Sequence, residues 1–264
     1  SGFSSASSRK LIITVAASAP NLNYYCYYHS GMGGAINTNS TLGSSNFDGT
    51  LQATVKANTT AGFSIVTYTG TGGNTTVGHG LGVAPEWYIL KSRDNSEDWA
   101  VYVTVIDGSL DYMYLNTTAA KADSGLTAPT SSVIYRGSAD SNGEKMIMYC
   151  FSEVAGYSKF GKYIGNGNAN GTYIYTGFRP AWIMVKRIDS TKSWPIFDNK
   201  RDPDNVASLF LYTNTFGSEN NSAFIDFLSN GFKFRTNSSV GNDGGNSYVY
   251  FAFAESPFKN ARAR

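Results

Sequence analysis

Three side chains near the start of the sequence are of types that bind transition metals. Cys26, His29 and Met32 follow one another at three-residue intervals in YYCYYHSGMGG, residues 24–34. Sulfur ligands together with an imidazole suit copper, and a weak axial methionine tunes its potential. The spacing therefore indicates a possible copper site, and no other cofactor is predicted. The alternative is a β-hairpin whose Cys26 and Met32 fill a core and whose glycines make the turn.

This segment resembles the C-terminal loop of cupredoxins, the blue-copper proteins. In that family a cysteine, a histidine and a methionine share one loop and meet a second histidine from upstream. In this sequence no histidine precedes Cys26, and the Cys26-to-Met32 spacing is shorter than in plastocyanin-type loops. The resemblance implies that residues 1–36 form a short β element like the end of a cupredoxin domain.

Carboxylates that could hydrolyse a polysaccharide are the second candidate chemistry. Glycoside hydrolysis requires two carboxylates across the scissile bond. Asp94, Glu97 and Asp98 lie in a predicted turn, whereas Glu153 and Glu255 occupy equivalent strand ends, which indicates a shared structural role. We therefore predict no catalytic residue and expect a protein that is not an enzyme. A polysaccharide depolymerase is the alternative.

His79 stands in the sequence Gly-His-Gly, which could be taken for part of a catalytic site. A histidine base needs a nucleophile in a recognisable setting, and the sequence offers none beside it. Gly-His-Gly is more typical of a tight turn in which the imidazole bonds to backbone. We expect this structural role for His79.

Aromatic side chains in polar loops are the candidates for ligand binding. Loops rich in Tyr, Ser, Gly and Asn are typical of binding surfaces. The residues predicted on this basis are Tyr135, Tyr163, Tyr173 and Phe216. The four tryptophans could stack on sugars, but they recur at equivalent positions, and this favours a place in the core for them.

The elements that must position these residues repeat along the chain. When the sequence is aligned with itself at an offset of 95 residues, Trp87 aligns with Trp182 and Trp99 with Trp194. Matching Gly, Pro, Lys and Asp residues surround them. We call residues 62–156 copy one and residues 157–258 copy two. Each copy has a length that suits a β-sandwich, and the two could also share one continuous core.

Short apolar runs bounded by Gly, Asn and Ser predict the strands. The predicted strands are 63–69, 86–92, 99–105, 112–115 and 145–154 in copy one, and 173–177, 181–187, 193–198, 208–213, 231–236 and 247–255 in copy two. Residues 222–229 could form a helix of two turns. The predicted core includes all four tryptophans, together with residues such as Met148, Met184 and Phe232.

The expected fold is all-β, with tandem β-sandwich or jelly-roll-like units after the short N-terminal β element. The divisions are 1–36, a connector at 37–61, a first repeat at 62–156 and a second at 157–264. Charged residues make up only 15%, and aromatic residues 14%. A net charge of +2 is too small and too scattered for nucleic-acid binding, and no apolar run is long enough for a membrane helix.

The whole sequence resembles a family of marine bacteriophage structural proteins. The strings that carry the resemblance are YYCYYHSGMGG, TNSTLGSSNFDG, GHGLGVAP, GFRPAWIMVKR and FAFAESPFK. It implies a virion location in a tail fibre, tail tip or surface fibre, with adhesion to a host-surface glycan. A virion adhesion protein is expected to contact other virion proteins and to form a homo-oligomer, most naturally a trimer if it is a fibre.

Overall fold

The computed structural model describes residues 22–25, 33–36, 43–137 and 140–255. The chain divides into two compact units, Ser1–Ser44 and Ser45–Arg264. In the first, β1 (Leu22–Tyr25) pairs antiparallel with β2 (Gly33–Ile36), and Tyr25 stands opposite Gly33. Cys26, His29 and Met32 lie outside the described residues, so the copper site stays a prediction.

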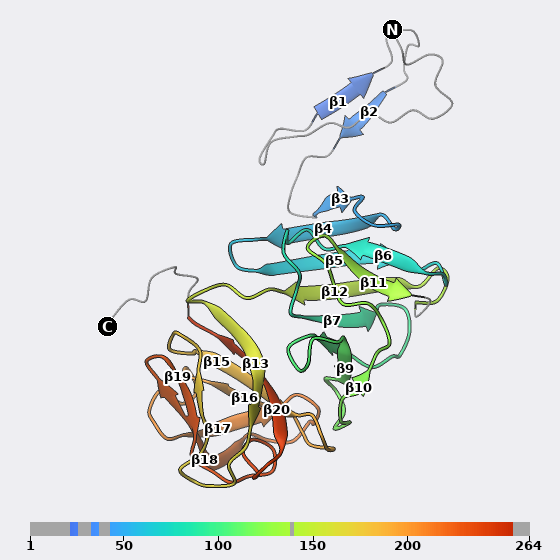
Figure 1. The fold of residues 1–264 in the computed structure, drawn as a ribbon. Helices are drawn as coiled ribbons and strands as arrows, with labels where there is room; N and C mark the ends of the chain where they lie inside the picture. The colour runs from blue at the N-terminus through green and yellow to red at the C-terminus, as the bar shows by residue number, and fades with distance from the viewer. Residues whose placement is uncertain (1–21, 26–32, 37–42, 138–139, 256–264) are drawn as a thin grey trace. The chain divides into compact units, whose positions relative to one another are not determined.

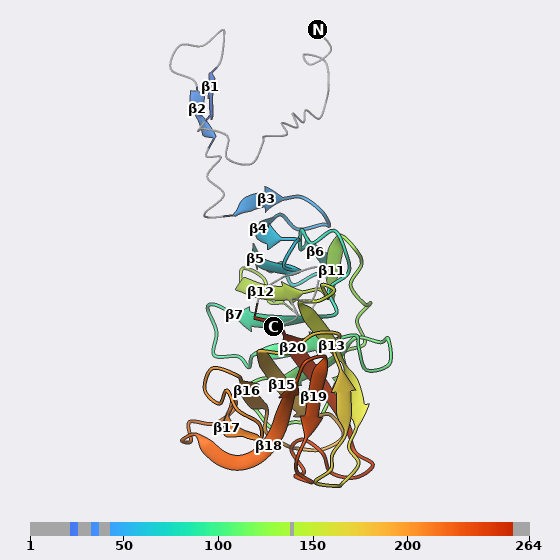
Figure 2. The ribbon, with the colours of Figure 1, turned by 90° about the vertical axis from the view of Figure 1, so that its left-hand side faces the viewer.

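The second unit is all-β, as predicted, and its described residues contain no helix. Copy one, together with two strands that precede it, forms an eight-stranded sheet, and Figure 2 shows several of its strands lying side by side. In spatial order its strands are β10 (Ala122–Asp123), β9 (Asp111–Tyr114), β8 (Ala100–Val103), β7 (Trp87–Ser92), β12 (Lys145–Phe151), β5 (Phe63–Thr69), β4 (Ala53–Asn58) and β3 (Ser44–Asn46). A separate pair of strands, β6 (Thr75–Gly78) and β11 (Val133–Gly137), packs on one face of this sheet.

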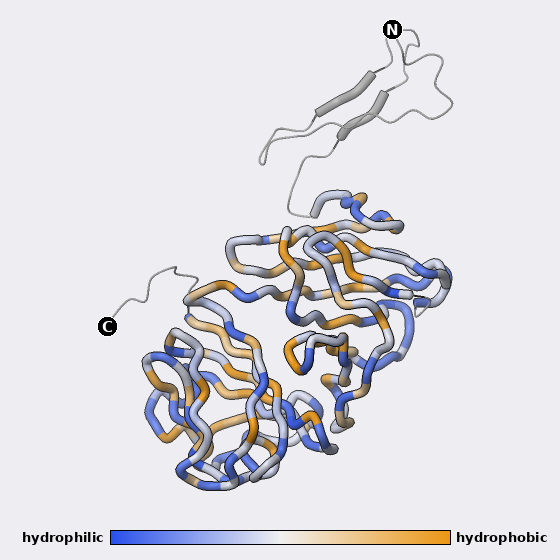
Figure 3. Tube along the Cα trace, viewed as in Figure 1, coloured by the Kyte–Doolittle hydropathy of each residue, from blue (hydrophilic) through white to orange (hydrophobic). Residues whose placement is uncertain are grey.

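Copy two forms a second eight-stranded sheet that curls into a nearly closed, barrel-like form (Figure 1). In spatial order its strands are β13 (Ser158–Ile164), β20 (Ser247–Phe253), β15 (Trp182–Arg187), β16 (Pro195–Asp198), β17 (Ala207–Tyr212), β18 (Asn220–Leu228), β19 (Gly231–Phe234) and β14 (Tyr173–Tyr175). Hydrophobic stretches follow the strands, and the connecting loops are largely hydrophilic (Figure 3).

The strand order of copy two repeats that of copy one. The order β5-β12-β7-β8-β9-β10 corresponds to β13-β20-β15-β16-β17-β18, and the pair β6-β11 corresponds to β14-β19. Turn hydrogen bonds repeat as well, because the Gly70 amide donates to the Glu144 carbonyl at 2.8 Å and the Gly165 amide donates to the Asn246 carbonyl at 2.9 Å. The sequence repeat is therefore also a repeat of topology.

Three layers of core hold the second unit together. One lies between the copy-one sheet and the β6–β11 pair, and a second lies inside the curled sheet of copy two. The third lies between the copies and brings Trp87, Val101 and Val103 of copy one against Trp194 and Phe251 of copy two. Each copy thus has its own core, and the two also share one.

Three expectations differ from the structure. Trp99 is 38% exposed rather than buried, because the shared core takes up Trp87 and Trp194 and leaves Trp99 outside. Residues 222–229 lie mostly in β18 rather than in a helix. Four consecutive residues of β18 are buried, so its sequence lacks the alternation that marks a strand. Part of the expected connector, Ala53–Asn58, is β4 and pairs with β5.

Candidate functional site

A pocket of about 430 Å³ opens in copy one, between its eight-stranded sheet and β11. We call it the copy-one pocket. Its apolar and aromatic lining is Leu90, Ala100, Tyr102, Tyr114 and Met146. Its polar lining is Ser92, Ser96, Glu97, Asp98, Arg136 and Asp140. The volume lies within the range of sites that hold small ligands.

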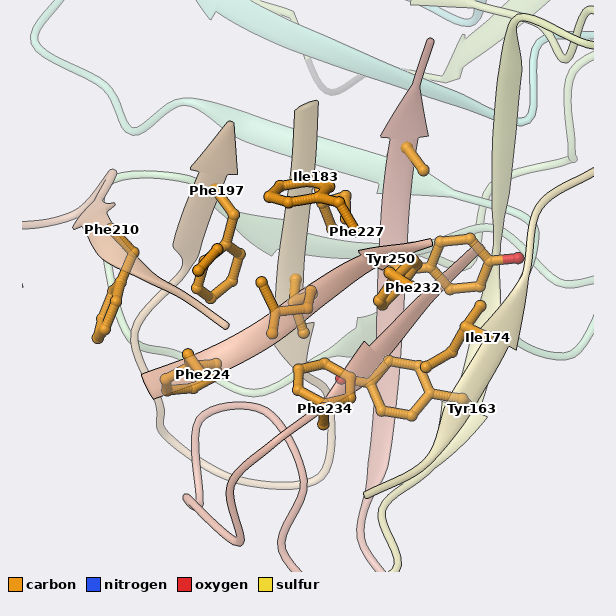
Figure 4. Packing of buried hydrophobic residues seen from close by; sticks show 14 of the residues in the cluster. Tyr163, Ile174, Ile183, Phe197, Phe210, Phe224, Phe227, Phe232, Phe234 and Tyr250 are labelled. Atoms are coloured by element: carbon orange, nitrogen blue, oxygen red, sulfur yellow. The ribbon is translucent and has the colours of Figure 1, made fainter. Parts of the chain in front are cut away.

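The pocket exists because one strand of copy one is short. In copy two the long β18 supplies Phe224, whose ring centroid lies 5.0 Å from that of Phe197 and 6.1 Å from that of Phe234 (Figure 4). The equivalents of Phe197 and Phe234 in copy one are Tyr102 and Arg136, and both line the pocket. The equivalent of β18 is β10, which has two residues, both exposed. The space that Phe224 fills in copy two is therefore open in copy one.

A buried arginine forms the inner wall of the pocket. Arg136 is 1% exposed, and its Nε and Nη2 donate to the two carboxylate oxygens of Asp140 at 3.2 and 2.9 Å. The Tyr68 hydroxyl donates to the same carboxylate at 2.6 Å. The guanidinium also lies over the Tyr102 ring, 5.2 Å from its centroid. Its remaining nitrogen, Nη1, has no hydrogen-bond partner among the described residues.

Burial raises the pKa of Tyr68, and the nearby Asp140 carboxylate raises it further against the opposing effect of Arg136. The hydroxyl therefore keeps its proton and remains a donor to Asp140. Burial likewise raises the pKa of Tyr88, whose ring stacks on that of Tyr102 at a centroid distance of 4.8 Å. The inner wall thus carries one cation, Arg136, and one compensating carboxylate.

The rim of the pocket is a loop that the rest of copy one holds in place. The Lys91 ammonium donates to the carbonyls of Ser92 and Asn95 at 2.9 and 3.0 Å. The Asn95 side chain donates to the Glu144 carboxylate at 2.8 Å. Because these contacts fix the loop at its start, Glu97 and Asp98 stand at the pocket on a positioned backbone.

Copy two contacts the backbone that carries Tyr114. The indole N–H of Trp194 donates to the Tyr114 carbonyl at 3.0 Å, and the Thr213 hydroxyl donates to the neighbouring Leu115 carbonyl at 2.8 Å. Tyr114 is half-buried, and burial raises the pKa of its hydroxyl. The second copy thus helps to set the position of a pocket residue in the first.

The aromatic residues predicted as ligand contacts do not meet at this pocket. Tyr163 lies in β13 rather than in a loop, is buried, and donates its hydroxyl to the Gly241 carbonyl at 2.6 Å. Tyr135 lies in β11 beside Arg136, so strand alternation directs it to the opposite face. Tyr173 is 43% exposed on β14, and Phe216 is fully exposed.

Sequence reasoning missed the residues that form the pocket, apart from Glu97 and Asp98, which were considered only as catalytic acids. A signal existed in the comparison of the copies. Tyr102 aligns with Phe197 at the 95-residue offset of the repeat, whereas the match of Arg136 to Phe234 follows only from their places in β11 and β19. A polar residue that replaces a core aromatic residue in one copy of a repeat marks a position at which the two copies differ in function.

The described residues hold no group of three or more His, Cys, Asp or Glu side chains that could bind a metal ion. His79 makes the backbone contact that was predicted, with Nε2 at 3.1 Å from the Thr130 carbonyl. No helix in the described part of the chain is long and apolar enough to cross a membrane.

Residues 37–257 match one protein family, described as a domain of unknown function (DUF7483). The chain belongs to the DUF7483 family. The match begins before β3, covers copy one and copy two up to residue 257, and includes every residue of the copy-one pocket. No curated protein and no solved structure matches the chain. The pocket is thus part of the DUF7483 domain, whose function its description leaves open.

Proposed function

We propose that this protein is a virion structural protein, a component of a tail fibre or surface fibre, that binds a host-surface glycan through the copy-one pocket. The observation that carries the proposal is the pocket itself, where the half-buried Tyr114 ring and the acceptors Glu97 and Asp98 converge. An aromatic ring among hydrogen-bonding side chains matches a sugar, which has apolar ring faces and polar hydroxyls.

The virion location is supported by the resemblance to marine bacteriophage structural proteins and by the low charge and aromatic-rich strands. The pocket occurs in one copy, since Phe224 fills the equivalent space in the other. One weak site in each chain gains avidity when several chains are held together. We therefore propose a homo-oligomer, with a trimer favoured, that contacts other virion proteins.

The test is binding of the purified oligomer to host cells and to an array of their surface glycans. Ser96→Trp places a large side chain at the exposed rim of the pocket, and Ala100→Phe places one inside it. Both should abolish binding. Thr54→Phe places a large side chain on the exposed face of β4, outside the pocket lining, and should bind like the wild type. Unchanged binding by both pocket variants would refute the proposal.

A polysaccharide depolymerase is the second candidate, because two carboxylates, Glu97 and Asp98, stand at the pocket. Asp98 accepts a hydrogen bond from the Asn116 side chain at 2.7 Å. Release of reducing ends from host polysaccharide, lost in both Glu97→Gln and Asp98→Asn, would identify the enzyme. Binding without release of reducing ends would identify the adhesin.

A further inference from the structure

The charges around the copy-one pocket restrict the sugar that it can take. Resting on the glycan-binding function proposed above, we infer that the pocket takes a sugar residue without an acidic group. Sugars that carry a carboxylate, phosphate or sulfate are rejected.

The positive charge of Arg136 is already compensated within the protein. Asp140 takes up Nε and Nη2, and the Tyr68 hydroxyl donates to the same carboxylate. Its third nitrogen, Nη1, is buried and has no hydrogen-bond partner among the described residues. Because Asp140 already neutralises the guanidinium, Arg136 leaves no unpaired positive charge that would attract an anion into the pocket.

The other charged residues of the lining are acidic. The described lining has one cation, Arg136, and three carboxylates, those of Asp140, Glu97 and Asp98. The nearby Lys91 ammonium is bound to the Ser92 and Asn95 carbonyls of the rim loop. An acidic sugar would therefore bring its charge against uncompensated carboxylates, and like charges at close range weaken binding. Neutral hydroxyls can instead donate to Glu97 and Asp98.

The aromatic ring that can receive a sugar is Tyr114 rather than Tyr102. Tyr102 is covered by the Tyr88 ring and by the Arg136 guanidinium, at 4.8 and 5.2 Å from its centroid. Tyr114 is half-buried and lines the pocket, with its backbone carbonyl held by Trp194. A sugar that stacks on Tyr114 lies in the same pocket as Arg136, Glu97 and Asp98.

The experiment is calorimetric titration of the intact protein with methyl glucoside, methyl N-acetylglucosaminide and methyl glucuronide. Glucuronide has the glucose ring with a carboxylate in place of one hydroxymethyl group. We expect the glucuronide to bind roughly tenfold more weakly than the better neutral sugar. This difference in affinity should decrease as added salt screens the carboxylates. Equal or tighter binding of glucuronide overturns this inference and leaves the glycan-binding function standing. Binding of none of the sugars overturns both.

A pair of matched variants locates the effect. Glu97→Gln with Asp98→Asn should raise the affinity for glucuronide several-fold and leave the neutral sugars within about twofold. The control Asp204→Asn with Glu219→Gln removes the same charge from exposed acids of copy two and should change neither affinity. If the control shifts glucuronide binding as far as the pocket variant does, net charge rather than the pocket sets the preference, and the inference fails.

Discussion

At the scale of single residues, the copies differ most where copy one keeps buried polar groups. Arg136 and Asp140 form an ion pair whose side chains are 2% and 3% exposed, at positions where copy two has Phe234 and Asn242. Replacing a buried ion pair with apolar residues often leaves stability unchanged or improves it. Copy two shows that the fold accommodates an uncharged alternative, which supports a ligand-related role for the pair in copy one.

His79 makes the stability of copy one depend on pH. Burial lowers its pKa below the usual 6.5, against the opposing effects of the Thr130 carbonyl and Asp48. The Thr130 carbonyl requires a proton on Nε2, and Nδ1 accepts from the Leu81 amide at 3.3 Å. A second proton would remove that acceptor. The folded state therefore resists a proton that the unfolded chain takes up below about pH 6.5.

We predict that the free energy of unfolding contributed by His79 falls as the pH drops below about 6.5, by at most about 1.4 kcal/mol per pH unit. Urea denaturation between pH 7.5 and 5 measures this fall. His79→Gln should flatten the curve in that interval, whereas His29→Gln, which changes the only other histidine, should keep it. Identical curves for the wild type and His79→Gln would contradict the prediction.

At the scale of elements, the same strand pattern serves two purposes because two strands differ in length. β18 runs from Asn220 to Leu228 and pairs with both β17 and β19, so it carries Phe224 over the core of copy two. Its equivalent β10 covers only Ala122–Asp123 and pairs with β9. The opening of the pocket is therefore a property of strand length and not of a catalytic or binding motif.

The equivalent tryptophans Trp99 and Trp194 should differ in their contributions to stability. Trp194 is fully buried in the shared core and donates its indole N–H to Tyr114, whereas Trp99 is 38% exposed. We predict that Trp194→Ala lowers the free energy of unfolding by about 3–5 kcal/mol and Trp99→Ala by less than about 1 kcal/mol. Urea denaturation measures both, and similar losses would show that the two indoles do not differ in burial.

At the scale of the whole second unit, the two copies are joined by a core and by polar contacts. The equivalent residues Phe151 and Phe253 lie 6.0 Å apart between ring centroids, and Trp87 lies 4.3 Å from Phe251. The Lys186 ammonium donates to the Thr118 carbonyl of the other copy at 3.3 Å. Because neither copy buries this face alone, we expect the copies to unfold together.

Val103→Asp places a charge in the shared core and tests this cooperativity. We predict a loss of several kcal/mol and faster amide hydrogen exchange in both β7 and β15. Thr54→Asp, on an exposed position of β4, is the control and should exchange like the wild type. Faster exchange confined to copy one would mean that the copies are independently stable.

The sequence by itself determined the β class, the duplication and most strands. The alternation of runs such as Phe63–Thr69, whose buried and half-buried residues alternate, reflects contacts with the two faces of a sheet, and this pattern is local. The consecutive buried residues of β18 broke the alternation, and the burial of Trp194 but not Trp99 depended on the packing of one copy on the other.

Only the tertiary structure decided the candidate site. Asp98, Tyr114 and Arg136 come from three separate segments, and each has an ordinary neighbourhood in the sequence. They converge because β10 ends early and leaves open a volume that copy two fills with Phe224. An unfilled space depends on what distant segments fail to cover, and no local spacing of residues encodes it.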